Sequence, residues 1–133
     1  MPKRFTLEEA NDLVQQLSVL MDGVRDCRRR IAAKEAELSG MRSQGRGGNG
    51  NYQAREREIR SAREEINELV GELQKRVSEV HDLGCEVKDM EMGLVDFLAI
   101  RDGDEVYLCW RLGEERIGFW HTTEGGFGAR QPL

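Results

Sequence analysis

Two long segments of this chain carry an apolar residue at every third or fourth position, and this spacing constrains the fold more than any other feature. A stripe with that spacing lies on one face of an α-helix and must pack against another element. The first segment opens with a capping box, in which the Thr6 hydroxyl accepts from the Glu9 amide and the Glu9 carboxylate reaches back. After the second segment, Gly84 is placed as a helix C-cap. The sequence therefore predicts helices over about residues 6–43 and 52–83.

The segment between the two predicted helices, residues 44–51, is too rich in glycine and asparagine to continue a helix. Glycine readily takes positive φ angles and is costly to order in a helix, so this composition marks a turn. A short loop between two long helices makes them antiparallel neighbours. Residues 1–84 are therefore predicted to form a long, coiled-coil-like helical hairpin with a flexible tip at residues 44–51.

The C-terminal part of the chain predicts a small antiparallel sheet, because two apolar runs flank Asp102-Gly103. An Asp-Gly pair between such runs is a strong signal for a two-residue β-hairpin turn. That turn fixes the register of the two strands and places Asp96 opposite Cys109. A third strand is predicted near residues 117–121, which gives a three-stranded meander.

Alternation of side chains along the strands sorts them onto two faces of the sheet. One face is wholly apolar and is predicted to cover the base of the hairpin; its members are Val95, Phe97, Ala99, Val106, Leu108, Trp110, Ile117 and Phe119. The other face mixes apolar and polar side chains, among them Asp96, Cys109 and Trp120. The predicted fold class is α+β: a helical hairpin over residues 1–84 and a β-rich module over residues 85–133 packed on its base, together one structural domain.

The net charge of −5 resides entirely in residues 84–133, whereas residues 1–83 carry equal numbers of acidic and basic side chains. A surface that binds nucleic acid usually has a basic excess, so this distribution argues against nucleic acid as a partner. No apolar run approaches about 20 residues, and the start of the chain lacks the apolar core of a signal peptide, so no membrane partner is predicted. Three widely spaced cysteines without a CxxC pair agree with a cytoplasmic protein.

Three stretches of the sequence together carry a resemblance to a bacterial family. They are residues 5–11 (FTLEEAN), residues 86–97 with EVKD and GLVDF, and residues 108–133 with LCWRLGE, FWH and the terminal RQPL. On these motifs the chain resembles domain-of-unknown-function family 2203 (DUF2203) from end to end, most specifically in its C-terminal part. The resemblance implies no particular activity. One departure is Leu98, where the family pattern usually has proline, and this leaves the strand over residues 94–100 freer to pair.

Asp96 is the most informative single residue, because it interrupts an otherwise apolar run and a polar group on such a face needs a partner. One interpretation is a cross-strand ion pair with Arg111, the commoner arrangement. The other makes Asp96 a ligand or acid-base group facing Cys109, with Arg111 and Lys88 lowering its pKa. His121 with a nearby carboxylate offers a combination suited to a metal, although its spacing matches no known ligand pattern.

The glycine-rich stretch before Arg130 could present backbone amides to an anion, although a plain terminal loop is the simpler interpretation. The full set of candidate ligand-binding residues is polar or aromatic and is expected where the β-rich module meets the hairpin base; it comprises Lys88, Asp89, Asp96, Arg111, Glu114, Trp120, His121 and Arg130. No nucleophile-base pair or carboxylate dyad can be identified. No catalytic residue is therefore proposed, and the cofactor and the identity of any metal stay open.

Two functions from different classes fit these observations. The first is a non-enzymatic interaction or scaffold module that forms a homodimer, or pairs with another helical protein, through the hairpin. Its basis is the long apolar stripe on an arm too thin to bury it fully. The alternative is a small-ligand or metal-binding protein with its site at the junction of the β-rich module and the hairpin base.

Overall fold

The computed structural model describes residues 3–44 and 52–133, and its contacts divide the chain into two compact units. One unit, Asp26–Lys75, is called the arm here, and the other, Met1–Arg25 with Arg76–Leu133, is called the base. The boundary between the two units falls inside the two long helices. The division at residue 84 between a hairpin and a β-rich module stays a prediction. Except for residue 44, the predicted flexible tip lies outside the described residues.

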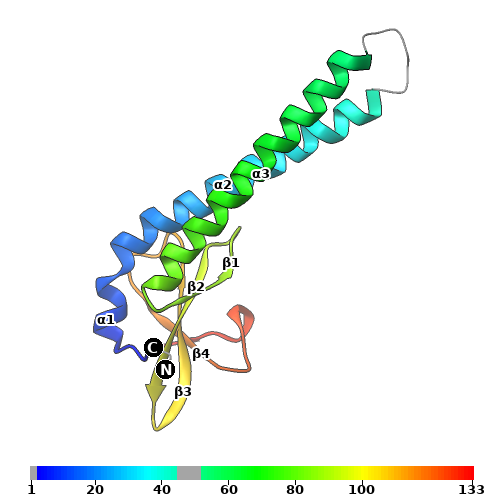
Figure 1. Ribbon diagram of the computed structural model, residues 1–133. Helices are drawn as coiled ribbons and strands as arrows, with labels where there is room; N and C mark the ends of the chain where they lie inside the picture. Colours follow the sequence, from blue (N-terminus) through cyan, green and yellow to red (C-terminus); the bar gives the residue numbers. More distant parts are fainter. Residues whose placement is uncertain (1–2, 45–51) are drawn as a thin grey trace. The chain divides into compact units, whose positions relative to one another are not determined.

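The predicted helical hairpin is confirmed, with one difference at its start. The helices are α1 (Leu7–Asp12), α2 (Val14–Gln44) and α3 (Tyr52–Asp82), and the first predicted helix is thus split in two (Figure 1). The capping box is present, since the Glu9 amide donates to the Thr6 hydroxyl over 3.1 Å and the Thr6 amide donates to the Glu9 carboxylate over 2.9 Å. The split falls at Leu13, whose amide donates to the Ala10 carbonyl in a tighter turn than an α-helix makes.

In the arm, α2 and α3 pack together along the apolar stripes that the sequence predicts. The buried side chains at the centre of this contact are Cys27, Ile31 and Leu69, with Leu73 packed against them. The Cys27 thiol donates to the Leu69 carbonyl over 3.2 Å. Lys34 adds an ion pair with Glu65 at 2.6 Å. The apolar stripes of α2 and α3 therefore pack against each other. Self-association of the arm stays a prediction.

The base contains a five-stranded antiparallel meander, larger than the three strands predicted. In sheet order the strands are β1 (Glu86–Asp89), β2 (Leu94–Arg101), β3 (Asp104–Arg111), β4 (Phe119–Thr122) and β5 (Gln131–Pro132). The predicted hairpin turn is confirmed, because Asp102 has φ 52° and Gly103 has φ 86°, as a type I′ turn requires. The predicted pairing of Asp96 with Cys109 is also confirmed.

The predicted assignment of β4 to the faces of the sheet is wrong by one residue. Phe119 pairs with Cys109 and therefore lies on the mixed face, whereas Trp120 pairs with Leu108 on the apolar face. The reason is that β3 and β4 are joined by a loop over residues 112–118 and not by a tight turn, so the sequence pattern does not fix their register. His121, two residues after Phe119, is thereby brought to the mixed face.

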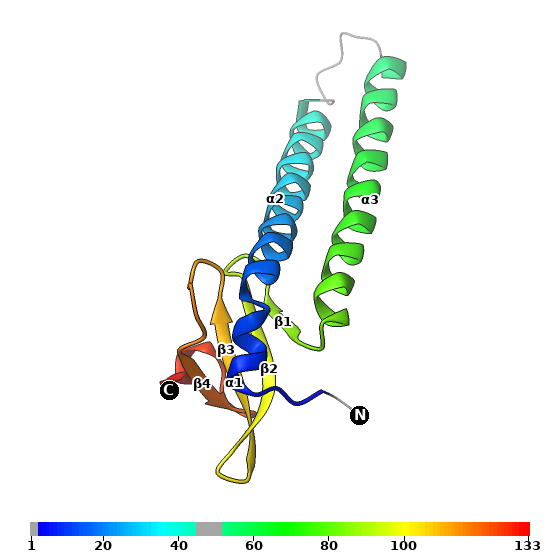
Figure 2. The same ribbon diagram turned by 90° about the vertical axis from the view of Figure 1, so that its left-hand side faces the viewer.

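The core of the base forms between the apolar face of the sheet and the helical residues of this unit. Figure 2 shows α1 lying across the sheet. Phe5 packs edge-on against Phe97 with ring centroids 5.0 Å apart, and its amide donates to the Leu98 carbonyl over 2.7 Å. Trp110 is fully buried, and the Asn11 side chain accepts from the Ile117 amide over 2.8 Å. Within the described part of the chain, no helix has the length and apolar character needed to span a membrane.

Candidate functional site

Three adjacent strands bring an acid, a thiol and an imidazole together on the mixed face of the sheet. Asp96 on β2 is paired directly with Cys109 on β3, and His121 on β4 is paired with Tyr107, two residues before Cys109. Asp96 and His121 are each 3% exposed, and they are the buried polar residues of the described chain, while Cys109 is 1% exposed. One ligand atom from each of the three residues lies within 4.8 Å of the others.

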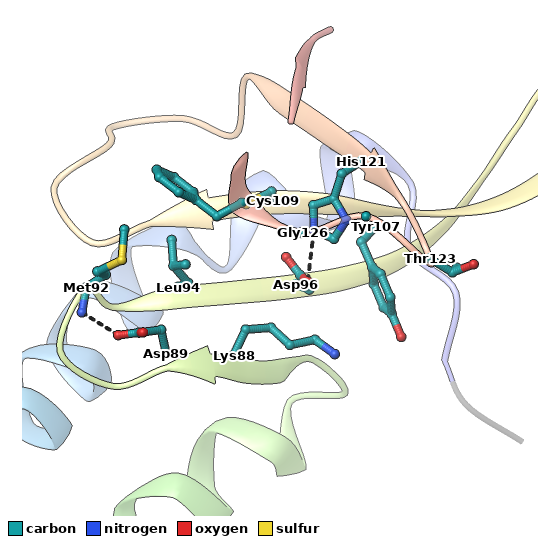
Figure 3. Close-up of a pocket in the computed structure, with 12 residues that line it drawn as sticks. Lys88, Asp89, Met92, Leu94, Asp96, Tyr107, Cys109, His121, Thr123 and Gly126 are labelled. Atoms are coloured by element: carbon teal, nitrogen blue, oxygen red, sulfur yellow. Dashed lines mark hydrogen bonds and ion pairs between the residues drawn. The ribbon is translucent and has the colours of Figure 1, made fainter. Parts of the chain in front are cut away.

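The imidazole of His121 is held at both nitrogens. Its Nδ1 lies 2.8 Å from the Thr122 carbonyl oxygen, which can only accept, so Nδ1 carries a proton. Its Nε2 lies 3.0 Å from Oδ2 of Asp96, and one proton is shared across that contact (Figure 3). The pair is therefore neutral as a whole, which is how two ionisable groups are tolerated at this depth.

Burial sets the protonation of the acid and the thiol. It raises the pKa of the Asp96 carboxyl above its ordinary value, although the nearby His121 and Lys88 oppose the shift. The predicted lowering of this pKa is thus wrong, because desolvation outweighs the neighbouring cation. Burial likewise raises the pKa of the Cys109 thiol to about 12, with the adjacent Asp96 carboxylate adding to the effect. Cys109 is consequently a neutral thiol at physiological pH.

A pocket of about 370 Å³ opens over these three residues (Figure 3). Its remaining lining is partly polar and partly apolar and consists of Lys88, Asp89, Met92, Leu94, Tyr107, Thr123, Gly125, Gly126 and Phe127. Pockets of this volume are at the small end of those that hold metabolites. The buried cluster therefore has access to a small molecule or ion from outside.

A β-bulge in β1 shapes one wall of the pocket. Asp89 pairs with Leu94 after a register shift that follows Val87, so the consecutive residues Lys88 and Asp89 both line the pocket. Asp89 accepts from the Met92 amide over 2.7 Å and closes the turn into β2. The Lys88 ammonium lies 4.8 Å from the centre of the Tyr107 ring and pairs with Glu86 at 2.8 Å.

Four of the eight residues proposed from the sequence meet at this pocket: Lys88, Asp89, Asp96 and His121. The other four do not line the pocket. Glu114 and Arg130 form an ion pair at 2.6 Å, and the Arg130 guanidinium stacks on Phe119 at 3.8 Å. The Glu114 carboxylate also accepts from the Arg111 amide.

Trp120 lies outside the pocket as well, beneath the Arg101 guanidinium at 4.7 Å, because it is on the apolar side of β4. The predicted ion pair between Asp96 and Arg111 is wrong. Asp96 bonds His121, whereas Arg111 pairs with Leu94 in the sheet and its guanidinium lies 5.7 Å from the Phe127 ring. The register of β4 differs by one residue from the predicted one, and it brings His121 next to Asp96.

Cys109 is the member of the buried cluster that the candidate set lacks, although the sequence carried the signal for its position. The Asp102-Gly103 turn alone places Cys109 beside Asp96, and that register is correct. Tyr107 could have been found in the same way, since it lies two residues from Cys109 on the same face. The lining contributed by residues 123–127 has no comparable signal, because these residues belong to a loop and a 3₁₀ turn, η2 (Phe127–Ala129).

The cluster combines three types of donor atom that transition metals bind. Nitrogen, sulfur and oxygen donors from His, Cys and Asp are the ligands that zinc takes in proteins, whereas magnesium and calcium prefer oxygen alone. A tetrahedral zinc ion, at about 2.0–2.3 Å from each donor, keeps its ligands roughly 3.3–3.8 Å apart. The present separations, up to 4.8 Å, are within a small side-chain adjustment of that geometry.

Comparison with known proteins identifies a family. The model of a family described as "Uncharacterized conserved protein (DUF2203)" matches residues 3–133. Searches of curated proteins and of solved structures find no match. The match covers essentially the whole chain, including both strands of the β2–β3 hairpin and the residues of the pocket, and the chain accordingly belongs to the DUF2203 family.

Proposed function

We propose that this protein binds a divalent transition metal of the zinc class through Oδ2 of Asp96, Sγ of Cys109 and Nε2 of His121. The observation that carries the proposal is the convergence of three different donor types within 4.8 Å, buried at the floor of a pocket. A buried Asp–His pair alone would serve the fold. The Cys109 thiol adds a sulfur donor next to that pair, and the pocket opens over all three residues; together these two features favour a ligand site.

The surroundings of His121 support the same proposal. A histidine that binds zinc usually donates its other N–H to a carbonyl or carboxylate, which fixes the tautomer and turns the lone pair toward the metal. The Thr122 carbonyl holds Nδ1–H in this way and leaves Nε2 to face Asp96 and Cys109. Metal loading then displaces two protons, one from the Cys109 thiol and one shared by Asp96 and His121.

Three protein ligands of total charge −2 neutralise a divalent cation in the buried site. This balance matters because an uncompensated charge at 1–3% exposure would be strongly destabilising. A cytoplasmic location, as the sequence suggests, would keep Cys109 reduced and able to bind metal.

The test measures zinc binding to purified, reduced protein by competition with a chromophoric chelator, together with metal content by mass spectrometry. We expect one zinc ion per chain. Replacing a ligand should cost more than the 10–100-fold that loss of an outer-shell contact typically costs. Cys109→Ser is the most informative variant, because it preserves the size of the side chain and leaves the Asp96–His121 pair in place.

Cys85→Ser is the matched control. Cys85 is a buried cysteine of the base, as Cys109 is, but its thiol donates to the Val80 carbonyl and lies outside the cluster. We expect this variant to bind zinc like the wild type. Absence of zinc binding at micromolar concentrations, or equal loss in Cys85→Ser and Cys109→Ser, would contradict the proposal.

A second proposal, from a separate observation, is that the arm self-associates. Tyr52 and Val70 remain exposed on α3, and because they are five full helical turns apart they share one face of that helix. Apolar side chains on a common face are suited to packing against another helix, such as that of a second copy. Sedimentation of the wild type and of a Val70→Lys variant across a wide concentration range tests it, with a monomer throughout as the contradicting result.

A further inference from the structure

Three protein donors leave the proposed metal with an open coordination position. Zinc in proteins is four-coordinate, and sites with three protein ligands hold water or an exogenous ligand in the fourth position. All three donor residues line the pocket, and on their other side is the backbone of the sheet. The open position therefore faces the pocket.

Charge at the pocket favours an anion in that position. Lys88 is the cationic residue among the described residues that line it, and the pKa of its ammonium is raised by its hydrogen bond with Glu86, so it is charged at neutral pH. The carboxylate of Asp89 is already engaged by the Met92 amide. Because Asp96 and the Cys109 thiolate neutralise the metal, the charge of Lys88 is left to attract an anionic ligand.

In the present structure the Lys88 ammonium forms an ion pair with Glu86, which does not line the pocket. The Lys88–Glu86 pair is 2.8 Å long, but the Lys88 side chain is 41% exposed and that of Glu86 56% exposed. Exposed pairs of this kind contribute little and exchange readily. A ligand anion in the pocket can therefore replace Glu86 as the partner of Lys88.

The apolar part of the lining indicates the chemical class of that anion. Met92, Leu94, the Tyr107 ring and Phe127 provide walls that an inorganic ion would leave uncovered. A short hydrocarbon group would bury against them and gain free energy from leaving water. The Tyr107 ring borders both groups, because its centroid lies 5.6 Å from that of the tilted His121 ring and 4.8 Å from the Lys88 ammonium.

We propose that the metal's open position takes the carboxylate of a small organic acid, with one oxygen on the metal, the other on the Lys88 ammonium, and the hydrocarbon part against Met92 and Phe127. This inference rests on the proposed metal site and names its ligand class. In this arrangement the metal ion and the Lys88 ammonium together orient one carboxylate. The pocket should therefore prefer organic acids to the corresponding amides, which carry no negative charge.

The test uses protein loaded with Co²⁺, which takes the ligands of zinc and reports its coordination by visible absorption. Acetate, butyrate, acetamide and inorganic phosphate are titrated into the loaded protein. We expect acetate and butyrate to change the Co²⁺ spectrum, with about fourfold tighter binding for each buried methylene. Acetamide should have no effect at the same concentrations, and phosphate should bind more weakly than butyrate.

Lys88→Met and Lys75→Met form a matched pair of variants. Both remove one lysine charge, but Lys75 is an exposed residue of the arm and Lys88 lines the pocket. Each variant is first saturated with Co²⁺ according to its own measured affinity. We expect Lys88→Met to bind butyrate roughly tenfold or more weakly, as loss of a charge-assisted hydrogen bond predicts, and Lys75→Met to behave like the wild type.

The outcomes separate the two proposals. If the wild type takes up no Co²⁺, the metal site itself is wrong. If Co²⁺ binds with a thiolate charge-transfer band that carboxylates leave unchanged, the metal site stands and the present inference is overturned. Binding of phosphate at least as tight as that of butyrate, or equal butyrate affinity in the two lysine variants, would also overturn it.

Discussion

At the scale of single residues, the unusual feature of this protein is an acid–imidazole pair placed in the interior of a sheet. Asp96 and His121 are both buried, and one hydrogen bond of 3.0 Å satisfies a polar atom on each. Removing either member leaves the other without that bond in a low-dielectric site. The two residues should therefore behave as one energetic unit.

A double-mutant cycle measures the coupling free energy between Asp96 and His121. Asp96→Ala and His121→Ala should each lower the free energy of unfolding by about 2–4 kcal/mol, because each leaves a buried polar group unpaired. The double variant should lose less than the sum of the two, with a coupling of about 1–3 kcal/mol. Urea unfolding in the presence of a chelator provides the values. Additivity within about 0.5 kcal/mol would show that the two residues act independently.

The buried thiols make stability depend on alkaline pH. Burial raises the pKa of Cys85 to about 11 and that of Cys109 to about 12, from an ordinary value of 9.0. Between pH 9 and 11 the unfolded chain loses these protons while the folded chain keeps them. The stabilising contribution is therefore complete below pH 9 and is lost as pH rises, by about 1.4 kcal/mol per pH unit for each thiol.

Urea unfolding of metal-free, reduced protein at pH 8, 9 and 10 checks this dependence. Other groups also titrate in this range, so the decisive comparison is between variants. Cys109→Ala and Cys85→Ala should each show a shallower decline in the free energy of unfolding between pH 9 and 10 than the wild type, by about 1 kcal/mol. Identical slopes in all three proteins would mean that the thiols are accessible to hydroxide in the folded state.

At the scale of secondary-structure elements, the sequence predicted most where local chemistry fixes geometry. The Thr6–Glu9 capping box and the Asp102-Gly103 turn both lie where expected, because each depends on residues a few positions apart. The pairing of Asp96 with Cys109 followed from that turn. The proximity of these two members of the site was thus predictable from the sequence.

The position of His121, the third member of the site, could not be predicted from local sequence patterns. The loop over residues 112–118 sets the register of β4 against β3, and this register decides which side chains of β4 lie on the face of Asp96. A shift of one residue would turn the His121 imidazole to the other face. β1 was not predicted either, since its four residues are mostly polar and contain a bulge before Asp89. Long-range pairing, not local propensity, decided both strands.

Alanine substitutions at Gly93 and Gly103 test which of the two turns depends on close packing. Gly93 has φ +71°, and a Cβ there would lie 2.5 Å from Cβ of Leu112, whereas Gly103 has φ +86° and open space around it. Alanine at either position should cost about 1–2 kcal/mol for the left-handed backbone. Gly93→Ala should cost about 1–3 kcal/mol more, because Leu112 has to move.

The comparison of the two glycine variants is made by urea unfolding, with the β2–β3 turn variant Gly103→Ala as the reference for the backbone cost. The turn before β2 also bears on the pocket, since the Gly93 carbonyl accepts from the Leu112 amide over 2.9 Å and the pocket residue Leu94 follows directly. Equal destabilisation of the two variants would show that Leu112 adapts without cost.

At the scale of the whole molecule, buried side chains are divided very unequally between the two units. Among its described residues, the arm buries only Cys27, Ile31, Ala62 and Leu69, whereas the base buries an apolar sheet face that includes Phe97 and Trp110. Free energy from apolar burial grows with the area removed from water, so the arm has less of it per residue. Its helices are therefore expected to open locally without unfolding of the base.

Hydrogen exchange decides whether the arm is marginal by itself or protected by a second copy. At low protein concentration, amides of Asp26–Lys75 should exchange at least about tenfold faster than those of β2 and β3, because local opening costs less than global unfolding. If the arm self-associates, its exchange should slow as the concentration rises while that of the sheet stays constant. Protection of the arm equal to that of the sheet at every concentration would contradict both expectations, since the two units would then unfold as one cooperative structure.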